Sequence, residues 1–234
     1  MFSVSVWRSW SVFNPSKINN PSKLSVDDAE RLCELIDLDI VKFIREVPKT
    51  ELHLHIEGTL EPELMFDLAK RNNIKIPYSN VDEVKSAYNF SNLETFLNIY
   101  YEGSKVLINE QDFFDLTWSY AVKCREDNIV HTEIFFDPQA HLSRGVKFET
   151  IINGINNALL KANKEFGLTY KIIMCFLRHL DEKSAFKVLD QAIEHKDKII
   201  AVGLDSSEKG NPPSKFKNVF NDLELIDVMK DKSD

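Results

Sequence analysis

Hydrophobic and polar positions along the chain follow two periods, one typical of strands and one typical of helices. Short apolar or β-branched runs predict four strands, at residues 50–56, 130–136, 169–177 and 198–205. Apolar residues spaced by three and four predict helices at residues 25–45, 62–72, 91–107, 112–127, 148–166 and 182–195, and one more after Pro213. Strands that alternate with helices indicate an α/β fold with a parallel sheet.

Polar residues that follow the predicted strands favour one edge of this sheet as the functional site. Three of the strands run into "HIEG", "DPQAH" and "GLDSSEKGNPP" at their carboxyl ends. In a parallel (β/α)8 barrel of the TIM type, these ends and the loops after them build the active site. A doubly wound open sheet would show the same pattern, so periodicity alone leaves both architectures open.

Composition narrows the class of protein. The 234 residues are 43% hydrophobic with a formal net charge of −8, so we expect a sizeable core and no nucleic-acid partner. No apolar run approaches the roughly 18 residues of a membrane helix, so we expect no membrane partner. Three separated cysteines without a C-x-x-C pair fit a reducing compartment. We expect a cytoplasmic location, with the nucleus as a second one.

The start of the chain differs from the rest. Residues 1–26 are rich in serine and contain no acidic residue, which resembles an organellar targeting sequence only in the depletion of acids. We expect residues 1–26 to be a disordered extension and residues 27–234 to form one folded unit.

The segment "ELHLHIEG" at residues 51–58 carries the candidate chemistry. His53, His55 and Glu57 follow at every second position, and this spacing in a strand places them on one face. Burying such polar groups is costly unless partners or a metal satisfy them. Because two neutral imidazoles on one strand face suit a divalent metal, the pattern predicts His53 and His55 as metal ligands.

Longer segments resemble a known family. "PKTELHLHIEGTLEPELMFDLAKRN" is similar to the opening strand and helix of the adenosine/adenine deaminase family within the amidohydrolase barrels. Glu57 with "GTLEPEL", "EIFFDPQAH" at residues 133–141 and "VGLDSSEKGNPPSKF" at residues 202–216 each resemble the adenine deaminase branch. The adenosine branch usually has aspartate at the position of Glu57 and arginine at that of Phe135. The likeness runs in order from residue 48 to about residue 220.

This resemblance implies a zinc-dependent purine aminohydrolase, most similar to enzymes that convert adenine and water to hypoxanthine and ammonia. His53 and His55 match the first two ligands of one zinc ion, and Glu57 matches an acidic position near the sugar or the region that replaces it. The segment that lines the purine pocket is matched by Asp205, Ser206, Ser207 and Glu208. The implied partner is a small-molecule purine, while a homo-oligomer and a partner fragment both stay open.

The resemblance stops after about four strands, whereas a complete barrel takes roughly 250 residues. The family's third zinc histidine, its proton-donating glutamate, a further catalytic histidine and a paired aspartate motif have no counterpart in the sequence. We therefore expect an N-terminal half of the barrel, assign no catalytic residue, and expect no useful adenine deamination by this chain alone. A non-catalytic fragment or interaction module and an adenosine deaminase remain the alternatives.

The other histidines are assigned roles outside the chemistry. His131 and Glu133 share a strand face and are expected to form a satisfied pair. His141 and His179 follow strand ends and are assigned no function, and His195 stands among charged residues and is expected to be solvated.

Two further residues near strand ends are assigned structural roles. Asp137 is expected to shape its loop by orienting Gln139 or Arg144. Cys175, inside the apolar run "IIMCFL", is expected to be a buried structural thiol.

Overall fold

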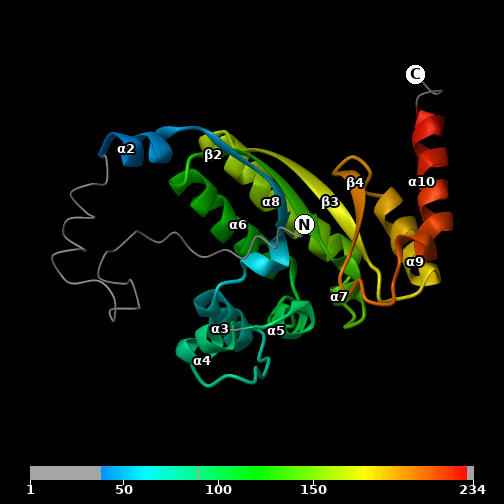
Figure 1. Ribbon diagram of the computed structural model, residues 1–234, viewed down its shortest axis with the longest axis horizontal. Helices are drawn as coiled ribbons and strands as arrows, with labels where there is room; N and C mark the ends of the chain where they lie inside the picture. Colours follow the sequence, from blue (N-terminus) through cyan, green and yellow to red (C-terminus); the bar gives the residue numbers. More distant parts are fainter. Residues whose placement is uncertain (1–37, 89, 231–234) are drawn as a thin grey trace.

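The computed structural model describes residues 38–88 and 90–230 (Figure 1). Its elements in chain order are α2 (Leu38–Glu46), β1 (Lys49–His55), η2 (Ile56–Thr59), α3 (Pro62–Arg71), α4 (Val81–Ala87), α5 (Leu93–Ser104), α6 (Glu110–Glu126), β2 (Ile129–Phe136), α7 (Pro138–Leu142), α8 (Phe148–Phe166), β3 (Thr169–Leu177), α9 (Glu182–Ile193), β4 (Ile199–Asp205), η3 (Pro213–Phe216) and α10 (Lys217–Lys230). The predicted extension at residues 1–26 and the first part of the predicted helix at residues 25–45 lie outside the described residues.

The described strands form one parallel sheet of four strands in the order β1-β2-β3-β4. Each strand therefore lies beside the strand that follows it in sequence, with a helix in every connection (Figure 1). A doubly wound sheet reverses its strand order at a switch point, whereas a barrel does not. The order confirms the α/β prediction and matches part of a TIM-type barrel, with β1 and β4 as the edges of the described sheet.

The two faces of this sheet are covered differently. Alternate side chains of β2 and β3 point to what we call the outer face; they are Thr132, Ile134, Phe136, Ile172, Met174 and Phe176, and all are buried. The apolar members of this set join one core with residues of α6, α8 and α9, and Figure 1 shows α6 and α8 lying along the sheet. The opposite face, here the inner face, carries His55, Phe135 and Cys175.

A helical excursion separates β1 from α6. Figure 1 shows α3, α4 and α5 grouped together, and α5 contacts both η2 and α7 at the carboxyl ends of the strands. The sequence pattern missed α4 and the short α7. Within the helix predicted at residues 91–107, Asn92 caps α5 and Thr95 completes the capping box.

The remaining boundaries follow the sequence pattern closely. The bounds of α8 and β3 coincide with the predicted ones, and α6, α9 and the other strands differ by a few residues at most. Among the described residues, no helix combines the length and the apolar character that crossing a bilayer requires.

Candidate metal and substrate site

His53 and His55 lie side by side on the inner face of β1. The centroids of their rings are 5.5 Å apart, and both rings pack on Phe135 of the neighbouring strand, at 4.6 and 5.2 Å. His53 is exposed and His55 is half-buried. The structure confirms that the two imidazoles share a face, while their role as metal ligands stays a prediction.

A β-bulge in β1 sets the direction of these side chains. The register between β1 and β2 shifts between Glu51 and Leu54, where β1 has one residue more than its neighbour. Strict alternation would place Glu51 on the same face as His53. Instead, Glu51 lies on the outer face, where it accepts a hydrogen bond at 2.8 Å from the hydroxyl of Tyr120 on α6. The bulge thus separates a structural acid from the two histidines.

Glu57 lies in η2, directly after β1, and its carboxylate is held by three groups. Oε1 accepts a hydrogen bond from the amide of Asp137 at 2.9 Å and lies 3.1 Å from Nε2 of His141, and Oε2 accepts one from the Tyr100 hydroxyl at 3.1 Å. Arg144 donates to Nδ1 of His141 at 2.7 Å. Because a guanidinium only donates, Nδ1 is unprotonated, and Nε2 carries the hydrogen that Glu57 accepts. Glu57 is therefore a fixed, buried acidic group.

Two more carboxylates flank His55. Its Nδ1 lies 3.3 Å from Oδ2 of Asp205, the last residue of β4, and 3.9 Å from Oδ1 of Asp137, which follows β2. Burial alone would lower the pKa of His55, but the hydrogen bonds and charges of the two carboxylates outweigh it and raise this pKa to about 10. Burial, and then the charge of Asp205, raise the pKa of Asp137 to about 7. Negative charge is thus concentrated around one imidazole.

Two tyrosines of α5 cover this group of side chains. The Tyr100 hydroxyl, besides reaching Glu57, lies 2.9 Å from Oδ2 of Asp137, and the Tyr101 hydroxyl donates to Oγ of Ser206 at 2.9 Å. Burial raises the pKa of both phenols, so they stay neutral donors. Ser206 has a φ of 75°, an unusual backbone conformation for a residue other than glycine and one that is often found at functional sites.

The segment after β4 only partly faces the site. Asp205 lies beside His55, and Ser206 is hydrogen bonded to Tyr101. Glu208 instead forms an ion pair with Arg178 at 2.7 Å. The carbonyl of Ser207 accepts a hydrogen bond from the side chain of Asn211 at 3.0 Å. Contact of these residues with a purine stays a prediction.

A match to a protein-family model identifies the family of this chain. The model of the family described as adenosine deaminase matches residues 48–228, which is most of the chain. The chain belongs to the adenosine deaminase family.

Relatives within this family are similar over the same part of the chain. An adenine deaminase of Psychrobacter cryohalolentis is 62% identical over 181 residues, which cover 77% of this chain and 54% of the relative. An adenine deaminase of Acinetobacter baylyi is 62% identical over 179 residues, which cover 76% of this chain and 54% of the relative. The chain therefore spans about half the length of the curated relatives it matches.

Solved structures agree with this assignment. The crystal structure of adenine deaminase from Arthrobacter aurescens superposes with a TM-score of 0.74 at 47% identity, covering 76% of this chain and 55% of that one. An amidohydrolase from Burkholderia ambifaria, whose structure contains bound Zn, superposes with a TM-score of 0.72 at 21% identity, covering 80% of this chain and 52% of that one. The second likeness, at this identity, shows the fold alone.

Asp137 does not have the predicted role. Its carboxylate contacts neither Gln139 nor Arg144 but faces His55 and Tyr100. Gln139 instead donates to Ser184 at 2.7 Å. A signal was available in the sequence, since an acidic residue directly after an apolar parallel strand stands at the edge where active sites form.

The predictions for the other histidines are confirmed only in part. His141, to which no function was assigned, is completely buried in the group around Glu57. His179 lies at the mouth of β3, with Nδ1 2.8 Å from Oγ of Ser206. The pair of His131 and Glu133 is confirmed, with 3.8 Å between Nε2 and Oε1. No local spacing relates His141 to Glu57, because the two meet only through the packing of α7 on η2.

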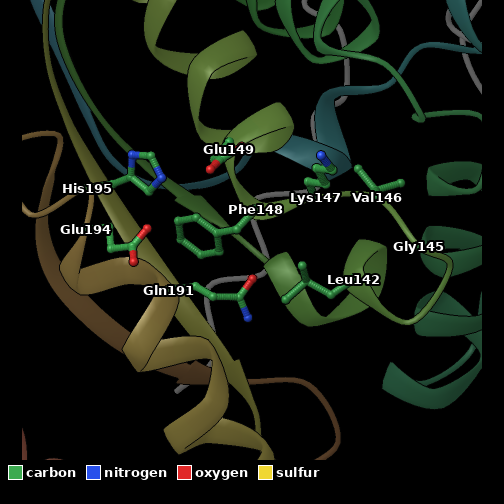
Figure 2. Close-up of a pocket in the computed structure, with 9 residues that line it drawn as sticks. All are labelled: Leu142, Gly145, Val146, Lys147, Phe148, Glu149, Gln191, Glu194 and His195. Carbon is green, nitrogen blue, oxygen red and sulfur yellow. The ribbon is translucent and has the colours of Figure 1, made fainter.

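His195 is not simply solvated. Its ring stacks on Phe148 with 5.5 Å between the centroids, beside a hollow of about 420 Å³ between the start of α8 and the end of α9 (Figure 2). The hollow shares none of its lining residues with the inner-face site.

Two sets of side chains can hold a metal ion, and they share His55. One is the pair of His53 and His55 that the family resemblance indicates. The other consists of His55, Asp137, Cys175 and Asp205, whose ligand atoms all lie within 4.8 Å of one another. Cys175 is buried as predicted, but its thiol faces this site instead of the core.

Proposed function

We propose that this chain supplies the N-terminal half of the active site of a zinc-dependent adenine deaminase. The observation that carries the proposal is an identity of 62% to proteins named adenine deaminase over residues that include the whole "ELHLHIEG" segment. The reaction would convert adenine and water to hypoxanthine and ammonia. Because the match covers about half of each relative, the chain would act together with the part of the barrel that the match leaves out.

His53 and His55 would hold the zinc ion from the inner face of β1. Both rings are accessible from that face and are fixed in direction by the stack on Phe135, which favours them as preformed ligands. Zinc, when bound, lowers the pKa of water and so provides a nucleophile near neutral pH.

Glu57 and Asp205 would orient the substrate, and Ser206, Ser207 and Glu208 would line the purine pocket. Glu57 is held in place by its three donors and, because its side chain is fully buried, would orient the substrate through the residues that it contacts. Tyr101 and His179 hold the Ser206 hydroxyl from two sides, so the start of the pocket segment is fixed before substrate arrives.

The test combines this chain with the remaining half of a relative. The chain is mixed or co-expressed with the part of the Psychrobacter cryohalolentis enzyme outside the match, and the zinc-dependent conversion of adenine to hypoxanthine is measured. We expect turnover by the combination and none by either half. Substitution His53→Ala should lower the rate by at least about 10²-fold, because metal-assisted catalysis is worth several kcal/mol.

His131→Ala is the matched control, since His131 lies on the inner face of β2 and pairs with Glu133. It should leave the rate within about twofold, as expected for a partly exposed pair. A combination that folds and binds zinc but releases no hypoxanthine would contradict the proposal. Faster turnover of adenosine than of adenine would support the adenosine deaminase alternative instead.

A further inference from the structure

His141 and Arg144 have no role in the proposed chemistry, yet they form a hydrogen-bonded chain that ends on Glu57. Nε2 of His141 lies 3.1 Å from Oε1 of Glu57, and both side chains are completely buried. Arg144 donates to Nδ1 of the same imidazole at 2.7 Å. We call Arg144, His141 and Glu57 the relay, because the imidazole connects the guanidinium to the carboxylate.

Three contacts fix the ring of His141. Arg144 and Glu57 occupy its two nitrogens, and the ring packs perpendicular to that of Phe113 on α6, with 4.9 Å between the centroids. Because a guanidinium only donates, the hydrogen of a neutral imidazole must be on Nε2. The ring is therefore held in one tautomer and in one direction, with its donor aimed at Glu57.

Arg144 is itself held at the carboxyl-terminal end of α5. Its guanidinium lies 2.9 Å from the carbonyl oxygen of Lys105 and 3.2 Å from those of Ser104 and Leu107. Carbonyls at the end of a helix carry partial negative charge, which a nearby cation stabilises. The side chain of Arg144 thus fixes both the imidazole of His141 and the end of α5.

Two routes from Arg144 therefore meet at Glu57. One runs through His141 to Oε1, and the other runs through α5, whose Tyr100 places its hydroxyl 3.1 Å from Oε2. Oε1 also accepts a hydrogen bond from the amide of Asp137 at 2.9 Å, and the Tyr100 hydroxyl lies 2.9 Å from Oδ2 of Asp137. The relay thus constrains both the backbone and the carboxylate of Asp137.

The position of Asp137 matters to the candidate metal site. Its carboxylate flanks His55, with 3.9 Å between Oδ1 and Nδ1. Residues behind metal ligands orient them, and their removal typically lowers metal affinity or activity by about 10–100-fold. A role in folding alone would not require a polar set, because apolar groups of similar shape can replace a buried polar pair with little loss of stability.

We propose that His141 and Arg144 are positioning residues of the deaminase site, which hold Glu57 and through it Tyr100 and Asp137. The inference rests on the proposed function for its effect on turnover, whereas the relay itself can be tested in this chain alone. His53 and His55 remain the proposed zinc ligands.

Amide hydrogen exchange, followed by NMR, tests the relay without turnover. The amide of Asp137 donates to Glu57, so its exchange reports how firmly that carboxylate is held. His141→Asn keeps an acceptor for Arg144 but has no donor that reaches Glu57. It should speed the exchange at Asp137 by about three- to tenfold, the effect of one hydrogen bond. His141→Gln keeps a donor near the position of Nε2 and should leave this exchange within about twofold.

Two controls separate the relay from a general loss of stability. Amides of β3 and α8 should exchange at the same rate in both variants as in the unmodified chain, because the relay acts on one site. Ser143→Ala changes the same segment outside the relay, since the exposed hydroxyl of Ser143 is hydrogen bonded to the carbonyl of Ala140, and it should leave the exchange at Asp137 unchanged.

The tautomer of His141 provides a second, direct readout. Nitrogen-15 NMR distinguishes protonated from unprotonated ring nitrogens, and we expect the hydrogen on Nε2 in the unmodified chain. Arg144→Met keeps an apolar side chain of similar length but removes the donor at Nδ1. In this variant the hydrogen should no longer be fixed on Nε2.

The effect on turnover is measured in the chain combined with the remaining half of the relative. His141→Asn should lower kcat by about tenfold or more, with a smaller change in KM, because the buried Glu57 acts through its neighbours and not on adenine itself. His141→Gln should restore kcat to within about threefold, and Ser143→Ala should leave it within about twofold.

The outcomes separate this inference from the proposed function. Exchange at Asp137 that responds equally to His141→Asn and His141→Gln, or amides of β3 that accelerate as much as Asp137 does, would overturn the relay. A hydrogen on Nδ1 of His141 in the unmodified chain would overturn it as well. Full turnover by His141→Asn would overturn the positioning role. No turnover by the unmodified combination would overturn the proposed function alone, and the exchange at Asp137 then decides whether the relay exists.

Discussion

The two faces of β2 differ in what their side chains do, although they alternate along the same eight residues. Ile134 and Phe136 point outward and are completely buried against the helices. Phe135, between them, points inward and is half-buried beside the histidines of β1. The outer face stabilises the fold by packing on the helices of this chain. The polar and aromatic side chains of the inner face stay partly exposed. Stability and chemistry are thus assigned to opposite faces of one strand.

The largest expected difference is between Phe136 and its neighbour Phe135. Phe136→Ala should lower the free energy of unfolding by about 3–5 kcal/mol, because it leaves a cavity in the closed outer layer. Phe135→Ala should cost only about 1 kcal/mol, mostly the ring contacts with His53 and His55. Urea unfolding followed by circular dichroism measures both, and Phe136→Leu serves as the milder variant if the alanine chain does not fold. Equal losses would contradict the assignment of the two faces.

A smaller effect is expected where α8 crosses α6. A Cβ atom at Gly154 would lie 2.5 Å from the carbonyl oxygen of Glu110 and 2.6 Å from Cβ of Phe113. Gly154→Ala should therefore destabilise the chain by about 1–3 kcal/mol through overpacking, despite the better helix propensity of alanine. The matched control is Gly103→Ala in α5, where the nearest atom to a new Cβ is Sδ of Met65 at 3.5 Å.

The control should be neutral or stabilising by up to about 1 kcal/mol, because only the propensity changes there. Thermal unfolding of the two variants measures this difference in stability. If Gly154→Ala is as stable as Gly103→Ala, the outer layer is less tightly closed than its contacts indicate.

The smallest expected effect is on the pH dependence of stability, and it concerns Glu51, which the bulge in β1 turns toward the helices. Burial raises the pKa of Glu51, although the hydrogen bond from Tyr120 opposes this. A carboxyl with a raised pKa in the folded state contributes stability below its unfolded pKa, and this contribution is lost as the pH rises through the folded pKa. Glu51→Gln should therefore lose less stability than the unmodified chain between acidic and neutral pH.

The control for this measurement is Glu149→Gln, which removes the same charge from an exposed position of α8. It should follow the pH dependence of the unmodified chain. Urea midpoints across the pH range provide the comparison, and an unchanged slope in Glu51→Gln would show that Glu51 is solvated in the folded chain.

The elements of the fold were predictable because their signals are local. The run "TYKIIMCFL" has the bounds of β3, and the apolar stripe of residues 148–166 has the bounds of α8. The order of the strands was not predictable from the period alone, because a barrel and a doubly wound open sheet share the same alternation of strands and helices. The resemblance to the family resolved that choice, and the observed order β1-β2-β3-β4 confirmed it.

The site was predictable only in part. His53 and His55 could be identified as a pair on one face from their spacing within a single strand. Asp137 could be placed at the active edge of the sheet, but its contact with His55 and that of His141 with Glu57 could not be predicted, because 82 and 84 residues of chain separate the members of these pairs. The bulge that turns Glu51 away from His53 also left no signal in the spacing, since it arises from the pairing of β1 with β2.

The sequence by itself determined the class of fold, the family, and the two adjacent histidines, because each depends on residues that are neighbours along the chain. Only the tertiary structure decided which side chains surround His55. The ends of four strands meet there, and their carboxylates, thiol and imidazole interact through distances of a few ångströms that no spacing along the chain records. The concentration of charge around His55 is therefore a property of the assembled sheet.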